Sequence, residues 1–259
     1  DIHPEYLTLD ETKIEAAITE KTTCILATHV FGNPCHVDEI AILAKKYNLK
    51  VIYDAAHAFG VTYKGETIFN YGDISTCSFH ATKIFHTGEG GALFCTDDAL
   101  RKTMFYSHNF GHDGALNYFG LGINGKASEL QAAMGLTVLP FIPNIFQDRK
   151  RIVEYYDDNL DFVRLNRLKI RESTQWNYSY YPIILESEAI LIAIQVELNK
   201  NKIFPRRYFY PSLNTLSFVK SNVMPISERI ASRILCLPLY VGLEVQDLKN
   251  IVNIINQNL

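Results

Sequence analysis

Near the start of the chain, short apolar runs that are typical of strands alternate with a segment whose apolar residues have helical spacing. CILATHVFG (24–32) and KVIYDAAH (50–57) are short apolar runs that end in turn residues, as buried strands do. Between them, VDEIAILAKKYN (37–48) has apolar positions at helical spacing and ends near two lysines, which suit the negative end of a helix dipole. A strand, a helix and a strand with short links predict a βαβ unit of a parallel sheet.

Further elements are expected along the rest of the chain, and the pattern of apolar and polar residues changes near residue 150. Residues 11–20 have apolar positions at helical spacing, and we expect strands at 73–81 and 91–98 and helices at 128–142 and 147–160. An edge or antiparallel strand is expected at 178–186, and helices at 188–201 and 244–259. The change predicts a large domain over residues 1–150 and a smaller α+β domain over residues 151–259.

Composition excludes several classes of protein. Hydrophobic residues make up 47% and charged residues 20% of 259, which is typical of a globular protein. The net charge of −3 gives no reason to expect nucleic acid or an anionic membrane as partner. Five widely spaced cysteines favour a reducing compartment. Without a membrane-length apolar run or signal-peptide features, we expect a cytoplasmic protein. The chain begins without methionine, so it is a processed chain or part of a longer one.

Asp54 and Lys83 are the first candidates for chemistry. Asp54 follows an apolar strand, at the carboxyl edge where parallel sheets bind ligands, although a turn or helix cap explains such a residue equally well. Lys83 lies in SFHATKIFHTGEGG (78–91), between apolar neighbours and a glycine cluster. Most lysines are solvated surface charges, but partial burial would lower the pKa of this one and supply the neutral amine that Schiff-base chemistry needs. Asn124 precedes a helix in a glycine-framed loop, where a turn is the better interpretation from composition alone.

Three segments carry a resemblance to a known family. DAAHAFG (54–60), SFHATKIFHTGEGGALFCTDD (78–98) and INGKASELQAAMGL (123–136) resemble the signature segments of the DegT/DnrJ/EryC1/StrS sugar aminotransferases, which depend on pyridoxal 5'-phosphate. The similarity covers nearly the whole chain and is faintest in 160–200. It implies the α/β fold type I, with a mostly parallel sheet in the large domain, a smaller C-terminal domain and a homodimer. Family members also have an N-terminal stretch before the counterpart of Asp1, so we expect an incomplete sheet and weak cofactor binding if this sequence is the whole molecule.

The resemblance also implies roles for individual residues. Lys83 would form the Schiff base with the cofactor and shuttle the proton, and Asp54 would pair with the pyridinium nitrogen. His57 would lie near the 3-hydroxyl, Ser78 would bind the phosphate, and Asn124 would reach the phosphate in the neighbouring subunit. For His57 and Ser78 the alternative is that polar residues at strand ends satisfy backbone groups.

The implied reaction moves an amino group in two halves. Glutamate donates it to the cofactor, and a nucleotide-linked keto-deoxysugar, such as a dTDP-4-keto-6-deoxyhexose for surface polysaccharide, accepts it. A branch of the family that dehydrates sugars has histidine in place of Lys83. RRYFYPSLN (206–214) resembles the segment of members that act on such sugars. Arg206 and Arg207 would then meet a diphosphate and Tyr208 a sugar or base, unless they are surface arginines beside packed aromatics.

Three other interpretations remain. A hydrolase using Asp54, His57 and Ser78 lacks the G-x-S-x-G elbow. A metal site has histidine pairs (80 and 86, or 108 and 112) but no accompanying acidic or cysteine ligands, so no metal is expected. A truncated, catalytically weak or inactive family member that keeps only binding or dimerisation would have no use for Lys83.

Overall fold

The computed structural model describes all 259 residues, and a four-stranded sheet organises the first half. Its strands are β1 (Cys24–Thr28), β2 (Lys50–Asp54), β5 (Ile74–Ser78) and β6 (Gly91–Phe94), in the order β1-β2-β5-β6. The first three are parallel, and β6 runs antiparallel to β5. The expected mostly parallel sheet is therefore confirmed.

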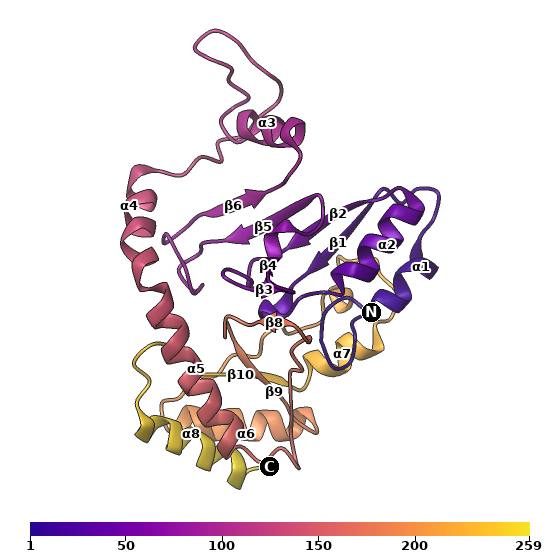
Figure 1. The fold of residues 1–259 in the computed structure, drawn as a ribbon. Helices are drawn as coiled ribbons and strands as arrows, with labels where there is room; N and C mark the ends of the chain where they lie inside the picture. Colours follow the sequence, from indigo (N-terminus) through magenta and orange to yellow (C-terminus); the bar gives the residue numbers. More distant parts are fainter.

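Helices and two short strands surround this sheet in Figure 1. They are the helices α1 (Ile14–Ala17), α2 (Val37–Tyr47), α3 (Asp98–Ser107) and α4 (Glu129–Val138), and the two-residue strands β3 (Thr62–Tyr63) and β4 (Glu66–Thr67). α2 forms the crossover between β1 and β2, and it begins and ends where the sequence predicts. His36 caps its first turn by accepting from the Glu39 N–H, and Asn48 ends it in the left-handed conformation.

The sheet buries one face and leaves the other open. Val51 and Tyr53 alternate onto the face that packs with α2. Leu26 lies on the opposite face and is 67% exposed. Since paired residues and every second residue share a face, the strand register places Asp54 and Ser78 on the open face as well. The sequence pattern thus separates a buried apolar face from an open face that ends in polar groups.

The chain leaves the sheet through α3, a projecting arm (residues 108–127) and a long helical run. The run consists of α4, a 3-10 turn (Leu139–Phe141) and α5 (Ile142–Asn159). In Figure 1 the arm extends away from the rest of the molecule, and α5 leads down to the C-terminal elements. The domain boundary that we expected near residue 150 falls inside α5. From Ile152 onward this helix belongs to a second core of 18 buried residues.

The C-terminal half has its own antiparallel sheet and helices. Its elements are β7 (Asn166–Arg167), β8 (Thr174–Gln175), β9 (Tyr181–Ile184), β10 (Ile234–Leu237), α6 (Glu188–Lys200), α7 (Pro225–Ala231) and α8 (Val245–Gln257). β9 is antiparallel, as expected, but lies in the middle of the order β10-β9-β7 rather than at an edge. β8 returns to pair with β3, so the two halves share one small sheet. No helix in the structure combines the length and apolar character needed to cross a membrane.

Arg149 joins α5 to the segment that faces the first half. Its guanidinium donates to the carbonyls of Tyr178 (2.8 Å), Ser179 (2.6 Å) and Leu239 (2.7 Å), and burial lowers its pKa to about 10. We expect Arg149→Met to lower the free energy of unfolding by about 3–5 kcal/mol, because three carbonyls lose their donor. Lys150→Met is the matched control, since the exposed Lys150 only pairs with Glu154. Urea unfolding of both variants checks this, and equal stability of the two would contradict it.

Candidate active site

The carboxyl ends of β2 and β5 bring two polar side chains to the open face. Asp54 is the last residue of β2, and one carboxylate oxygen accepts from the Ala56 N–H at 3.0 Å. The other oxygen makes no hydrogen bond within the chain. Ser78 is the last residue of β5, and its hydroxyl accepts from the His80 N–H at 3.3 Å. Asp54 therefore does hold a turn, as the simpler interpretation required, and still offers an oxygen to a ligand.

Lys83 lies in the loop that follows β5. Its backbone N–H donates to the His80 carbonyl at 2.9 Å, and the residue is half-buried. Phe59 stacks on Phe85 beneath the loop, with ring centroids 4.6 Å apart. This burial lowers the pKa of Lys83, while the Asp54 carboxylate opposes the shift. The structure thus provides the partly buried amine that the apolar neighbours of Lys83 predicted.

The glycine cluster makes the return of this loop possible. A side chain at Gly91 would place its Cβ 2.8 Å from the Cys77 carbonyl, closer than contacts allow. Gly90 has φ +153°, a conformation that other residues rarely adopt, and accepts from the Phe79 N–H at 2.8 Å. The glycines fix the loop close against β5 and so set the position of Lys83.

His57 is buried beside Lys83 and is held as a neutral ring. Its Nδ1 accepts from the Phe31 N–H at 3.0 Å, which assigns the ring proton to Nε2. Burial, followed by the nearby charge of Lys83, lowers its pKa to about 3. His57 therefore presents a donor, Nε2–H, at all ordinary pH values.

The C-terminal half supplies the opposite wall. His57, Lys83, Asn177 and Tyr180 all line one small pocket. Asn177 donates to the carbonyls of His57 (2.8 Å) and Phe59 (2.9 Å), which fixes the loop after β2. The sequence did not identify Asn177 or Tyr180, because they lie about 120 residues from His57 and follow no periodic pattern. The only signal was the unusual WNYSYY run at 176–181.

Not all predicted residues gather at this pocket. Tyr208 does not line it but packs behind it, with its ring centroid 6.1 Å from that of His57. Arg207 is occupied elsewhere: it donates to Glu188 at 2.5 Å and to the Ser232 carbonyl at 3.2 Å, and it lies over the Tyr210 ring. Asn124 lies on the exposed arm, where its side chain accepts from Lys126 at 2.8 Å. The structure therefore separates Arg207 and Asn124 from the pocket of the same chain.

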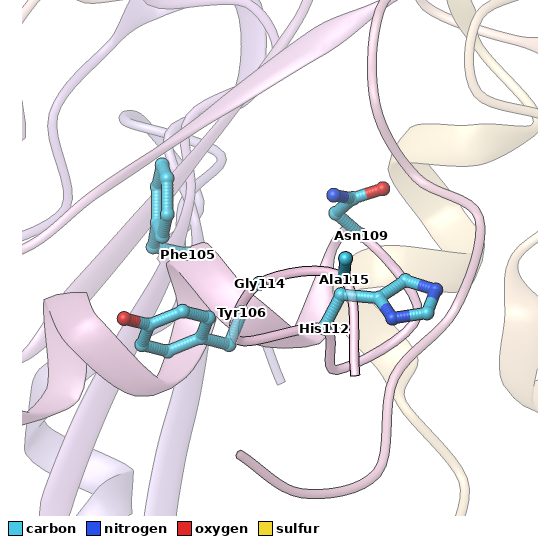
Figure 2. A pocket seen from close by; sticks show the side chains of 6 residues that line it. All are labelled: Phe105, Tyr106, Asn109, His112, Gly114 and Ala115. Atoms are coloured by element: carbon cyan, nitrogen blue, oxygen red, sulfur yellow. The ribbon is translucent and has the colours of Figure 1, made fainter. Parts of the chain in front are cut away.

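A second hollow lies on the outside, between α3 and the arm. Figure 2 shows its lining residues, which are Phe105, Tyr106, Asn109, His112, Gly114 and Ala115. It contains neither a lysine nor a carboxylate, so it lacks the groups for amine chemistry. Nowhere in the structure do three or more histidine, cysteine or acidic side chains gather in a way that could hold a metal ion.

Acid stability offers a test of the buried histidines. His29 is fully buried, its Nδ1 accepts from the Cys35 N–H at 2.9 Å, and burial lowers its pKa to about 3, as for His57. Below the unfolded value near 6.5 the unfolded chain binds a proton that the folded chain excludes. Stability is then lost as the pH falls from 6.5 toward 3, at up to about 1.4 kcal/mol per pH unit for each ring.

His29→Asn keeps a hydrogen-bond acceptor and removes the titrating ring. We expect it to reduce the number of protons taken up on unfolding by about one between pH 6 and 4, which lowers the slope of the unfolding free energy against pH. Urea unfolding at several pH values measures the slope. Identical slopes for the variant and the original chain would show that His29 already binds its proton in the folded state.

Comparison with known proteins defines the class. The model of the DegT/DnrJ/EryC1/StrS aminotransferase family matches residues 1–256, and the chain belongs to this family. It is a pyridoxal-phosphate-dependent sugar aminotransferase. The chain is similar to dTDP-4-amino-4,6-dideoxy-D-glucose transaminase of Shigella dysenteriae, with 38% identity over 253 residues that cover 95% of this chain and 69% of that protein. The transaminase of the same name from Escherichia coli is 36% identical over 256 residues, covering 94% and 68%.

Solved structures agree with this assignment. DesI, crystallised in the presence of its TDP-sugar product, superposes with a TM-score of 0.92 at 29% identity, covering 99% of this chain and 67% of DesI. The PLP form of a sugar aminotransferase from Streptococcus pneumoniae gives 0.90 at 25% identity, covering 100% and 74%. The fold type I architecture is therefore confirmed.

Proposed function

We propose that this protein transfers an amino group from glutamate to a nucleotide-linked keto-deoxysugar, a dTDP-4-keto-6-deoxyhexose, for surface polysaccharide. The observation that carries the proposal is the half-buried Lys83 amine, which shares a pocket with His57 beside the open carboxylate of Asp54. Relatives named as dTDP-amino-dideoxyglucose transaminases support the choice of sugar.

The residues present fit pyridoxal phosphate. Lys83 would hold the cofactor covalently through its partly desolvated amine, and the unpaired oxygen of Asp54 would suit the ring nitrogen. Ser78 offers a hydroxyl to the phosphate, and His57 offers Nε2–H to the 3-hydroxyl. When bound, the cofactor would supply an electron sink to the reacting carbon.

Lys83 is the group that moves the proton. Because burial lowers its pKa, a larger fraction of the amine is neutral at a given pH than for a solvated lysine. A neutral amine can take a proton from carbon and return it to the adjacent position. His57 stays neutral throughout, so it orients a ligand by donating and does not compete for that proton.

Two further contacts complete the proposal for the sugar. Tyr208, beside His57, faces the sugar or base. Arg206 is exposed and forms no ion pair, so its charge is available to an anion, whereas Arg207 is already paired with Glu188. Arg207 would need to leave that ion pair to bind a diphosphate.

The decisive experiment follows labelled nitrogen. We expect [¹⁵N]glutamate and a panel of nucleotide-linked keto sugars to give a labelled amino sugar only with pyridoxal phosphate present, with the dTDP-4-keto-6-deoxyhexose as the best acceptor. If a different sugar gives labelled product and the dTDP-4-keto-6-deoxyhexose does not, the choice of substrate is overturned. No product from any sugar, with cofactor bound, would favour the inactive binding module.

We also propose a homodimer. The arm and the flanking helices expose large apolar side chains, and Asn124 lies among them: Phe105, Phe110, Leu116, Tyr118, Phe119, Leu121, Ile123 and Leu130. Such a patch is typical of an interface, and it would carry Asn124 toward the phosphate site of a second copy. Sedimentation should give a dimer, and Leu121→Asp, at 96% exposure, should shift it to monomer without unfolding. A monomeric original chain would contradict the proposal.

A further inference from the structure

The backbone of Phe31 is bonded on both sides, once to each half of the chain. Its N–H donates to Nδ1 of His57 at 3.0 Å, and its carbonyl accepts from the indole N–H of Trp176 at 2.8 Å. His57 belongs to the loop after β2, whereas Trp176 follows β8 and comes from the C-terminal half. One residue therefore connects the C-terminal half to the ring of His57 through two hydrogen bonds.

Phe31 holds an unfavourable backbone conformation. Its φ of 56° lies in the left-handed region, which a bulky residue rarely adopts, and the residue is only 2% exposed. The next residue, Gly32, also has a positive φ, and a side chain there would place its Cβ 2.5 Å from Oδ1 of Asn177. Such strain persists only where the surroundings fix it, and it gathers at functional sites. Here the C-terminal half packs directly on the strained turn.

This contact determines which nitrogen of His57 carries the ring proton. A neutral imidazole has one donor and one acceptor nitrogen, so a donor on Nδ1 leaves the proton on Nε2. Packing holds the plane of the ring: Phe209 stacks on it with centroids 5.7 Å apart and planes 8° apart, and the Tyr180 ring lies 4.7 Å away. His57 also lines the pocket that contains Lys83. The Phe31 N–H therefore sets the tautomer of a ring whose plane is already fixed.

We propose that Phe31 and Trp176 are positioning residues, which hold His57 as an Nε2–H donor toward the 3-hydroxyl of the cofactor. The inference rests on the proposed function and adds two residues that act through His57. Trp176 fixes the Phe31 carbonyl, and the strained backbone then directs the Phe31 N–H at Nδ1. Without that N–H the ring proton could move to Nδ1. Nε2 would then be an acceptor, which repels the oxygen of an ionised 3-hydroxyl.

The tautomer of His57 can be measured without cofactor. In the full chain labelled with [¹⁵N]histidine, NMR distinguishes a bare ring nitrogen from N–H, and His57→Gln identifies the signals of His57. Replacing Phe31 by phenyllactate turns its amide into an ester, which removes the N–H and keeps the ring. We expect the ratio of the Nδ1–H form to the Nε2–H form to rise by about 10–100-fold. Trp176→Phe should shift it in the same direction by less.

A control variant separates this effect from loss of packing. The Tyr178 ring packs on Trp176, with centroids 5.0 Å apart, and makes no hydrogen bond to Phe31. Tyr178→Phe should therefore leave the His57 signals unchanged. If the ester at position 31 also leaves them unchanged, the Phe31 N–H does not set the tautomer and the inference is overturned.

Cofactor binding provides the second readout. We expect Trp176→Phe to raise the apparent dissociation constant of pyridoxal phosphate by about 3–10-fold, because the donor to the 3-hydroxyl is less well held. In a His57→Ala background the same change should matter by less than about twofold, since no ring remains to be positioned. Equal losses in both backgrounds would mean that Trp176 acts through packing alone, which also overturns the inference.

Failure of the proposed function is recognised separately. The His57 spectra and the cofactor binding are both measured before any sugar is added. A chain that shows the expected spectra and coupling but transfers no amino group to any sugar contradicts the proposed function and leaves the inference standing. A chain that binds no pyridoxal phosphate overturns the proposed function, and unchanged His57 spectra in the ester variant overturn the inference whatever the activity.

Discussion

Lys83→Ala abolishes amino transfer and the visible band that pyridoxal phosphate acquires on forming a Schiff base. The change removes both the covalent anchor and the group that moves the proton, and positioned proton transfer alone contributes roughly 10²–10⁴-fold. Folding should survive, because burial disfavours the charge of Lys83 in the first place. Absorbance and steady-state rates measure the effect, and borohydride reduction of the original chain should fix the cofactor on Lys83.

Controls separate chemistry from packing. Lys83→Met keeps most of the side-chain volume and should be equally inactive, whereas Lys21→Ala, at an exposed position, should behave like the original chain. Added methylamine should restore part of the activity of Lys83→Ala, because it replaces the missing base. A visible band that persists in Lys83→Ala would place the Schiff base on another lysine.

Local pattern and chain order were enough to find much of this molecule. The apolar runs that became β1, β2 and β5, and the helical spacing of α2, α6 and α8, depend on neighbours within one element. Asp54 and Lys83 could be singled out because Asp54 ends one strand and Lys83 follows the next, and parallel strands bring their carboxyl ends to the same edge.

What the sequence left open has a common cause, which is that long-range pairing leaves no local trace. The direction of β6 and the central place of β9 depend on which strands pair with them, and an apolar run carries no such information. The sequence could not decide between a diphosphate ligand and a packed surface arginine for Arg207, because its partner Glu188 lies 19 residues away. Asn177 and Tyr180 enter the pocket from the other half of the chain, through the return of β8 to β3.

Asp54 offers the other large effect, and the structure allows it to be tested with little disturbance. Asp54→Asn keeps an oxygen for the Ala56 N–H, so the turn after β2 should persist. It removes the negative charge that would hold the proton on the ring nitrogen of the cofactor. Without that proton the ring accepts electrons poorly, and we expect the transfer rate to fall by about 10²–10⁴-fold while the Schiff-base band remains.

A modified cofactor distinguishes this role from a structural one. N-methylated pyridoxal phosphate carries a permanent positive charge on the ring nitrogen, so it needs no carboxylate to keep it charged. If Asp54 acts on that nitrogen, the analogue should raise the transfer rate of Asp54→Asn at least about tenfold over its rate with ordinary cofactor. It should not raise the rate of Lys83→Ala. If the analogue leaves the low transfer rate of Asp54→Asn unchanged, Asp54 only holds the turn, because a charge on the ligand cannot repair a defect in the structure of the turn.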